Sequence, residues 1–472
     1  MKENNQQIRS GQPYLYRSKG FPSEVYQVRF RENIDNTHLN EALQQAIVRY
    51  PYFKIKLYEY EGDFFCQENP LPLTACETEE LPILGSLENN EYLIGITHHG
   101  VNMNISFHHA LTDGRGIKNF LETLIYYYCR IHYGNTDLIP GIHTAEEEVS
   151  QEEYAEPCAG KFSYNKENAG KVEGITRKAF ILPETKLPPV SHRRYEMRFP
   201  QQEFMALCKQ YGASPIILLS VMMSRAIQKL HPDNTRTINS NFPVDIRHAL
   251  GMEETFKNCV KSISLPYGTS QQSMSTAELC QHYKSLMQQQ RRPDYCRKEQ
   301  NMIVTLLNAV SLFHSYEKKQ KLLSFLEKLK LDTYLISYIG QFNLGSNEKY
   351  VDSVHLFSNG SDGLVLNMTC SGGYFTIDFV QDFESECYIN ALAEEMGEMG
   401  ICAEVSGRIE FTTPCDRLMQ DMEHIIIDRP NIWKKTVSAN VNAYQTVEDA
   451  FVNTFTGISD RIECLFNHRD RI

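Results

Sequence analysis

An alternating strand that ends in two histidines and leads through a glycine turn into a helix constrains the fold most. Apolar and polar residues alternate over 101–107, and His108 and His109 follow directly. The turn at 113–116 contains two glycines, and apolar residues recur at helical spacing over 117–128. Because side chains alternate across a strand, extended geometry points the two histidines to opposite faces. The pattern predicts a mixed α/β fold with both histidines at a strand end.

Further strands and helices are predicted on both sides of this unit. Upstream, residues 25–30 alternate as a strand, and a helix with Asp35 or Asn36 as its cap ends at Pro51. Downstream, Ser214 is the predicted cap of a helix that is apolar nearly all round. Further strands are predicted at 53–57, 179–182, 194–199, 260–265, 335–339 and 374–379, and further helices at 201–211, 216–230, 275–290, 316–331 and 386–399.

An acidic stretch lies between the two halves of the chain. Six glutamates fall within 146–156, in a segment with few apolar residues. Runs of charge are usually solvated surface. We therefore expect a solvated loop that leads into a crossover between two lobes.

Composition limits the class of protein. A chain of 472 residues is too long for one ordinary core, which favours two domains. The formal charge of −12 lacks the basic excess of a duplex-binding protein, so no nucleic-acid partner is expected. No apolar run reaches the length of an integral membrane segment, and the polar start lacks a signal-peptide pattern, so we expect a cytoplasmic protein. The 13 cysteines include no C-x-x-C pair, which favours free thiols in a reducing compartment.

His109 and Asp113 are the strongest candidates for chemistry by residue type and spacing. An imidazole can take up and return a proton near neutral pH, and an aspartate four residues on can orient it as in a triad. Alternatively, Asp113 braces the loop through an arginine, and His109 is held by its own backbone. By residue type alone, two adjacent histidines at a strand end are more often structural than catalytic.

Other chemistries find less support in the sequence. The pair His98-His99 lacks carboxylate or thiol ligands at familiar spacing, so no metal site is expected. No G-x-S-x-G elbow is present, which disfavours a serine nucleophile. No phosphate-binding glycine motif follows a strand, which disfavours nucleotide chemistry.

The heptapeptide HHALTDG at 108–114 resembles the H-H-x-x-x-D-G signature of a superfamily of acyltransferases. Its members include peptide-synthetase condensation domains, chloramphenicol acetyltransferases, BAHD acyltransferases, alcohol acetyltransferases and wax-ester synthases. The segment RYPYFK at 49–54 resembles the stretch before the family's first long strand. The segment PVDIR at 243–247, with the later Asn258, resembles its P-V-D-x-R…G-N block. The segment SYIG at 337–340 resembles its S-N-x-G strand. The stretch that begins with SGGY at 371–374 resembles a late strand that members pass across to the other lobe. The resemblance covers roughly residues 10 to 415.

The resemblance implies two chloramphenicol-acetyltransferase-like αβα lobes that form a pseudo-dimer with a tunnel between them. The N-terminal lobe would span 1–180 and the C-terminal lobe 181–415, followed by a tail of unassigned role at 416–472. His109 is then the general base. A structural role is implied for His108, Asp113, Gly114 and Arg247, with Asp113 paired to Arg247. The candidate residues of the substrate channel are Asn258, Ser337 and Gly340. Lys257 and Tyr338 replace the usual glycine and asparagine, and we expect both to reshape the channel.

The implied activity is transfer of an acyl group from a thioester to a hydroxyl or amine. The donor would be a coenzyme A thioester or an acyl group on phosphopantetheine, with no tightly bound cofactor and no metal. Expected partners are a small-molecule acceptor and, for a carrier-bound donor, an acyl carrier protein in trans. The alternative is a catalytically idle relative that only binds an acylated partner.

Overall fold

The computed structural model describes residues 6–16, 23–170, 172, 179–186, 192–327, 332–358 and 363–409. The tail predicted at 416–472 lies outside these ranges, as do the last residues of the helix predicted at 316–331.

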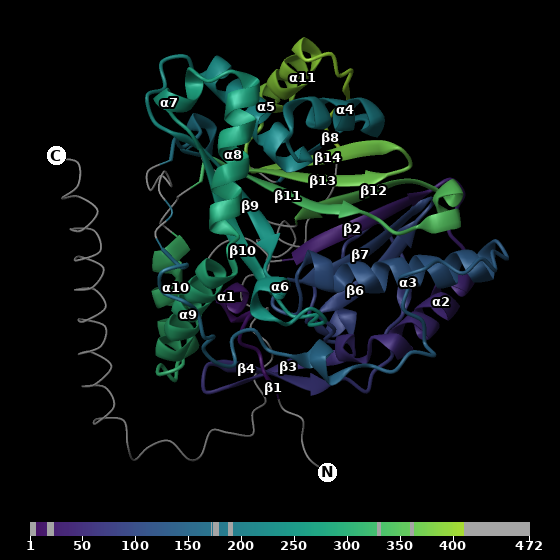
Figure 1. The fold of residues 1–472 in the computed structure, drawn as a ribbon. Helices are drawn as coiled ribbons and strands as arrows, with labels where there is room; N and C mark the ends of the chain where they lie inside the picture. Colours follow the sequence, from purple (N-terminus) through teal and green to yellow (C-terminus); the bar gives the residue numbers. More distant parts are fainter. Residues whose placement is uncertain are drawn as a thin grey trace.

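A five-stranded sheet in the order β12-β2-β7-β6-β5 forms the centre of the N-terminal lobe (Figure 1). Its strands are β2 (Ser23–Phe30), β5 (Ala75–Glu77), β6 (Ile94–His99), β7 (Asn102–His108) and β12 (Val351–Ser358). Helices α2 (Asn36–Arg49) and α3 (Gly114–His132) share one apolar core with these strands. Asp35 caps α2 by accepting a hydrogen bond from the His38 amide at 2.8 Å, as one of the two predicted caps.

A seven-stranded sheet in the order β10-β9-β11-β13-β14-β8-β15 forms the centre of the C-terminal lobe. Its strands are β8 (Arg193–Pro200), β9 (Ile238–Asp245), β10 (Val260–Tyr267), β11 (Tyr334–Gln341), β13 (Leu364–Ser371), β14 (Tyr374–Gln381) and β15 (Glu404–Val405). The helices that share its core are α4 (Gln201–Tyr211), α5 (Pro215–Leu230), α8 (Thr276–Gln290) and α11 (Cys387–Glu398). Ser214 occupies the N-cap position of α5 but makes no capping hydrogen bond through its side chain, so that detail of the prediction is wrong. The two sheets with their helices give the predicted mixed α/β architecture of two lobes.

The strand that passes from one lobe to the other is β12. The strand predicted for this role, which begins at residues 371–374, instead belongs to the seven-stranded sheet of its own lobe. Residues 371–374 turn between β13 and β14, and both strands belong to the seven-stranded sheet. β12 pairs antiparallel with β2, with Val354 opposite Val28. It also packs on β13, where Thr369 Oγ1 donates to the Val354 carbonyl at 2.5 Å. The sequence pattern predicts neither β12 nor β13, because both are buried on both faces and lack the alternation of a half-buried strand.

A small three-stranded sheet in the order β1-β4-β3 includes the N-terminal segment, because β1 pairs with β4. Its strands are β1 (Gln6–Gln7), β3 (Ile55–Tyr60) and β4 (Asp63–Glu68), and beside it lie α1 (Gln12–Leu15), α9 (Pro293–Val310) and α10 (Tyr316–Glu327) (Figure 1). A minor core of Tyr16, Phe64, Val310 and Leu323 joins these elements. The remaining helices are α6 (Arg247–Leu250), α7 (Thr269–Gln272) and short 3-10 turns at Pro51–Phe53, Leu87–Asn89, Gln151–Tyr154, Pro183–Lys186 and Gly345–Tyr350. The strand predicted at 179–182 is reduced to one bridge, between Ala179 and Thr237.

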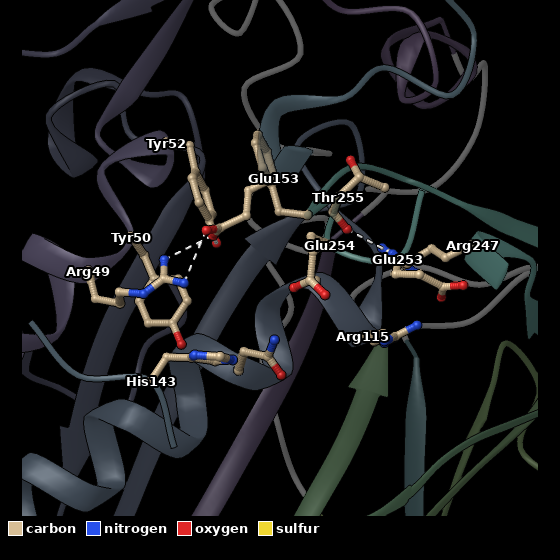
Figure 2. Close-up of a pocket in the computed structure, with 13 residues that line it drawn as sticks. Arg49, Tyr50, Tyr52, Arg115, His143, Glu153, Arg247, Glu253, Glu254 and Thr255 are labelled. Carbon is tan, nitrogen blue, oxygen red and sulfur yellow. Dashed lines mark hydrogen bonds and ion pairs between the residues drawn. The ribbon is translucent and has the colours of Figure 1, made fainter. Parts of the chain in front are cut away.

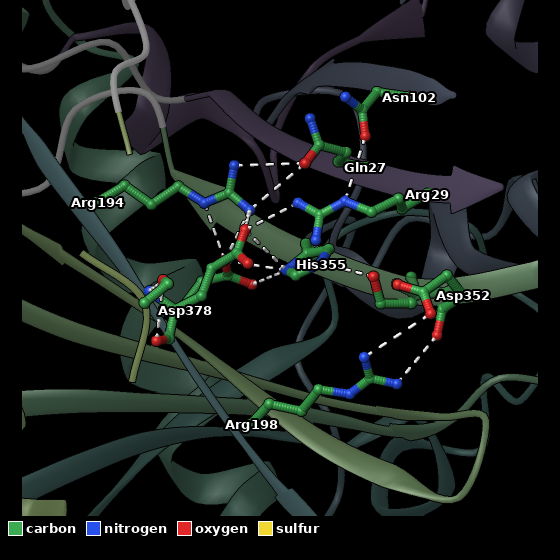
Figure 3. A network of polar contacts seen from close by, with 12 residues as sticks. Gln27, Arg29, Asn102, Arg194, Arg198, Asp352, His355 and Asp378 are labelled. Atoms are coloured by element: carbon green, nitrogen blue, oxygen red, sulfur yellow. Dashed lines mark hydrogen bonds and ion pairs between the residues drawn. The ribbon is translucent and has the colours of Figure 1, made fainter. Parts of the chain in front are cut away.

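A buried polar network joins the two main sheets (Figure 3). Arg194 of β8 lies 2.8 Å from both Glu196 and Asp378. Arg29 of β2 reaches Glu196 at 3.2 Å, and His355 of β12 reaches Asp378 at 3.2 Å. Burial raises the pKa of Asp378, but the charges of Arg194 and His355 outweigh burial and hold that pKa below its ordinary value. The network therefore ties β2 and β12 to β8 and β14 through paired charges.

Within the described ranges, no single helix is both long and apolar enough to cross a membrane. Helices α4 and α5 meet these limits only as a pair, and they are bent by 88° at their junction.

Candidate active site

His109 lies directly after β7, where elements of both lobes meet. Its ring stacks on Tyr14 of α1, with ring centroids 4.1 Å apart and planes 3° apart. Its Nδ1 lies 2.9 Å from Asn258 Oδ1, and Asn258 Nδ2 donates to the His109 carbonyl at 2.7 Å. Asn258 precedes β10 of the C-terminal lobe by two residues. The candidate base and one candidate channel residue are therefore in contact across the junction of the lobes.

The contacts of Asn258 define the tautomer of neutral His109. A backbone carbonyl only accepts hydrogen bonds, so the amide nitrogen of Asn258 faces the His109 carbonyl, and Oδ1 faces the ring. Because Oδ1 also only accepts, Nδ1 of His109 carries the proton. The lone pair of the neutral ring is then on Nε2. An imidazole in this form takes up a proton at Nε2.

His108, the last residue of β7, points into the protein. Its Nδ1 accepts a hydrogen bond from the Ala110 amide at 3.0 Å, and the residue is 8% exposed. Burial, with a smaller contribution from adjacent His109, lowers the pKa of His108 to about 3. His108 is therefore neutral near pH 7, which fits a structural role.

Acid should destabilise the fold through His108. Its pKa falls from 6.5 to about 3 on folding, so its stabilising contribution is present above 6.5 and is lost as the pH falls towards 3. We expect the melting temperature to fall more steeply between pH 7 and pH 5 in the wild type than in His108→Gln, which keeps a neutral acceptor. Parallel pH profiles for the two proteins would contradict this prediction.

Asp113 caps α3 and pairs with an arginine of the other lobe. Its Oδ1 accepts from the Gly116 amide at 2.9 Å and from Arg247 at 2.8 Å. Its Oδ2 accepts from the Cys259 amide at 2.9 Å. Both charged side chains are 1% exposed. The predicted contact between Asp113 and Arg247 is therefore present. Like the contact of His109 with Asn258, it joins the two lobes.

Arg247 organises the loop that leads into β10. Besides Asp113, it binds Asp245 at 3.0 Å and the carbonyls of Thr255 and Lys257, each at 2.8 Å. Burial lowers the pKa of Arg247, but Asp113 and Asp245 outweigh burial and raise that pKa above its ordinary value. The arginine is thus a permanent cation that fixes the backbone just before the residue that contacts the candidate base.

The two glycines of the turn let the lobes approach closely. A β-carbon at Gly114 would overlap the side chain of Ile339 on β11. A β-carbon at Gly116 would overlap the Phe256 carbonyl, to which Thr112 Oγ1 donates at 2.5 Å. Gly114 therefore meets a side chain, whereas Gly116 meets backbone of the other lobe.

Gly116→Ala should destabilise the protein by about 1 to 3 kcal/mol, the cost of overpacking a filled site, because backbone rather than a flexible side chain must move. Gly397→Ala in α11 is the matched control, since a β-carbon there meets nothing within 4 Å. Helix propensity predicts a gain of about 0.5 to 1 kcal/mol for the control. Urea unfolding measures both, and equal stability of the two variants would argue against the close approach.

The acidic segment at 146–156 is partly buried, so the prediction of a solvated loop is wrong for two glutamates. Glu153 is 6% exposed and binds Arg49 through both oxygens, at 2.9 and 3.0 Å. Glu156 pairs with Lys257 at 3.3 Å. Lys257, expected to reshape the channel, is 8% exposed and held in this pair. A serine three residues before Glu153 forms a capping box with it, and this spacing was the available sequence signal.

Ser337 and Gly340 lie on β11, the strand that meets the glycine turn. Ser337 is half-buried. Gly340 has a φ of 86° at an irregularity in the β11–β13 pairing. Tyr338 packs instead on the core of the C-terminal lobe, 6.1 Å from the Phe375 ring, and burial raises its pKa to about 12. Tyr338 is therefore partly buried against this core, and its expected effect on the channel stays a prediction.

A polar pocket opens beside Arg247 (Figure 2). Arg49 and Glu153 line it on one side, and Arg115 and the 253–256 loop line it on the other. Figure 2 shows Arg49 turned towards Glu153, and Arg115 pairs with an aspartate outside the pocket. Because Arg49 and Arg115 are already paired with carboxylates, we assign the pocket no anionic ligand.

Among the residues that the structure describes, Glu196, His355 and Asp378 bring ligand atoms within 4.8 Å of one another, close enough for a metal ion. They belong to the network of Figure 3, where Arg194 lies 2.8 Å from both carboxylates. The guanidinium supplies the positive charge that a metal would supply. The cluster is therefore explained as a charge network between the lobes.

Asn258→Leu should lower the activity of a His109-dependent enzyme by about 10- to 100-fold. The substitution removes the acceptor at Nδ1, and a hydrogen bond to a ring that becomes charged is worth about 1.5 to 3 kcal/mol. Asn258→Asp keeps an acceptor at Nδ1 and should retain more activity than the leucine variant. Wild-type rates in folded Asn258→Leu would show that the contact does not orient the base.

No protein-family model matches the sequence, and no curated protein matches it. Solved structures do match the fold. The trichothecene 15-O-acetyltransferase TRI3 from Fusarium sporotrichioides matches with a TM-score of 0.56 and 12% identity, over 84% of this chain and 95% of that chain. The first condensation domain of the CDA synthetase matches with a TM-score of 0.55 and 11% identity, over 83% and 94%. TRI101 from F. graminearum, solved with coenzyme A and T-2 mycotoxin, matches with a TM-score of 0.50 and 12% identity, over 85% and 100%.

Identities this low compare folds alone. The matches nevertheless extend over both lobes and nearly the whole of each relative. This chain therefore has the chloramphenicol-acetyltransferase-like fold of condensation domains and of the TRI3 and TRI101 acetyltransferases.

Proposed function

We propose that this chain is an acyltransferase that moves an acyl group from a thioester to a hydroxyl or amine, with His109 as the general base. The observation that carries the proposal is the contact between His109 and Asn258, which puts the proton of the neutral ring on Nδ1 and its lone pair on Nε2. The likeness in fold to acetyltransferases and a condensation domain supports the class of reaction.

In the proposed reaction, His109 Nε2 removes the proton of the acceptor while the acceptor oxygen or nitrogen attacks the thioester carbonyl. The tetrahedral intermediate collapses with cleavage of the C–S bond. The proton on Nε2 then passes to the leaving thiolate, so that atoms and charge balance without a covalent enzyme intermediate. Holding both substrates at the lobe junction supplies proximity, and Asn258 stabilises the imidazolium through Nδ1.

The proposed donor is a coenzyme A thioester or an acyl group on the phosphopantetheine of a carrier protein. TRI101 was solved with coenzyme A and a small-molecule toxin, which supports a coenzyme A thioester and a small-molecule acceptor. The likeness to a condensation domain supports a carrier-bound donor equally. Ser337 and Gly340 on β11 are proposed to border the substrate channel, and the proposed setting is the cytoplasm.

Release of free thiol tests the proposal directly. Purified protein would be incubated with acetyl-, hexanoyl- and palmitoyl-CoA and with mixed alcohols and amines, and thiol followed with a chromogenic disulfide reagent. We expect thiol release that depends on an acceptor and that His109→Ala abolishes. Absence of release from folded protein with every pair, and also with the same acyl groups on the phosphopantetheine of a carrier protein, would favour the alternative, a catalytically idle relative that binds an acylated partner.

A further inference from the structure

The N-terminal segment 6–16 lies over the candidate base. Tyr14 of α1 stacks face to face on His109, 4.1 Å between ring centroids. Gly11, just before α1, comes so close to Ala110 that a β-carbon at Gly11 would overlap the Ala110 carbonyl. Because Ala110 directly follows His109, the segment meets the motif loop at two neighbouring points.

The segment is anchored by residues outside that loop. The Ser10 amide donates to Glu156 at 3.0 Å, and the Gln12 side chain donates to Asp63 at 3.0 Å. Asp63 also pairs with Lys319 of α10, which is fully buried. These contacts hold α1 in place independently of the motif. The stack of Tyr14 on His109 therefore depends on the N-terminal segment, which lies outside the motif.

We propose that Tyr14 is a positioning residue, which holds the plane of the His109 ring and stabilises its protonated form during acyl transfer. The inference rests on the proposed function. The face of an aromatic ring attracts a cation placed over it. In the proposed reaction His109 becomes a cation when it takes the proton of the acceptor, so the stack favours the state formed along the reaction over the neutral ring. Asn258 holds the ring by its edge and Tyr14 by its face, which together set the direction of Nε2.

Three other titratable groups that the structure describes beside the motif loop, His108, Asp113 and Lys257, are neutral or paired. His108 is kept neutral by burial. Asp113 pairs with Arg247, and Lys257, next to Asn258 in sequence, pairs with Glu156. A change in the protonation of His109 on substitution of Tyr14 therefore reports on the stacked ring.

Modification of His109 by diethyl pyrocarbonate tests the inference without knowledge of the acceptor. The reagent reacts with neutral imidazole, so the pH midpoint of its rate, followed by peptide mass spectrometry, reports protonation. We expect Tyr14→Phe to match the wild type, and Tyr14→Leu, an apolar cover without a ring face, to move the midpoint down by about half a pH unit. His248, whose side chain is 92% exposed, is the internal reference. An unchanged midpoint in Tyr14→Leu, with folding checked by circular dichroism, overturns the proposal.

Acyl transfer gives a second readout. With acetyl-CoA and an acceptor from the panel, Tyr14→Leu should lower kcat by about 3- to 10-fold with little change in KM, and Tyr14→Phe should keep the wild-type rate. An equal loss in Tyr14→Phe would overturn the role of the ring face. A midpoint shift in a protein that transfers no acyl group would overturn the proposed function while supporting the effect of Tyr14 on His109.

Discussion

Replacing His109 with alanine should lower the rate of acyl transfer by about two to four orders of magnitude, the contribution usual for a positioned general base. The substitution removes Nε2, the atom proposed to take the proton of the acceptor. It leaves the ion pair of Asp113 and Arg247 at the lobe junction in place. Because the base acts in the transition state, kcat should fall while KM for the acyl-CoA changes little. Steady-state thiol release over a range of acyl-CoA concentrations separates the two constants.

His108→Ala is the control that separates chemistry from structure. His108 is buried, neutral and bonded to the Ala110 amide. Its loss should lower the melting temperature, while the folded fraction keeps a kcat near that of the wild type. Equal rates for the wild type and well-folded His109→Ala would exclude His109 as the base and leave Asn258 with a structural contact only.

The elements that the sequence predicted well are those with a local period. The helices α2 and α3 each carry one apolar stripe, and the cap of α2 at Asp35 is visible as a residue type. The strands β12 and β13 have no such period, since nearly all their residues are buried. The pairing of β12 with β2 joins segments more than 300 residues apart along the chain, and no local pattern names such a partner. Periodicity therefore indicated the type of most elements, whereas the crossover depended on packing between lobes.

The candidate site divides in the same way. His109, Asp113 and Arg247 were named from short motifs, because a fixed spacing of rare residue types is visible in one sequence. Tyr14 had no such signal, since a tyrosine near the start of a chain is ordinary, and only the fold brings it over His109. Glu153 was misjudged for the opposite reason. A run of glutamates looks solvated until a buried arginine is found opposite one of them.

Removing either partner of the Asp113–Arg247 pair should destabilise the protein by about 3 to 5 kcal/mol, because each substitution strands a buried charge. The two side chains lie 2.8 Å apart and are 1% exposed. Arginine suits the position because its planar fork binds several acceptors at once. Asp113→Ala leaves Arg247 paired with Asp245, whereas Arg247→Ala leaves Asp113 with the amides of Gly116 and Cys259. We therefore expect Arg247→Ala to be the more damaging single change.

A double-mutant cycle measures the coupling between the two side chains. The double variant should lose clearly less stability than the sum of the single variants, because neither charge is then left without its partner. Asp113→Asn is the isosteric control: it keeps an acceptor for the Gly116 amide but loses the charge, so its stability should lie between wild type and Asp113→Ala. Urea unfolding gives the free energy of unfolding of each variant, taken from the first transition of its unfolding curve. Additivity within about 0.5 kcal/mol would show that the amides of Gly116 and Cys259 hold Asp113 without help from Arg247.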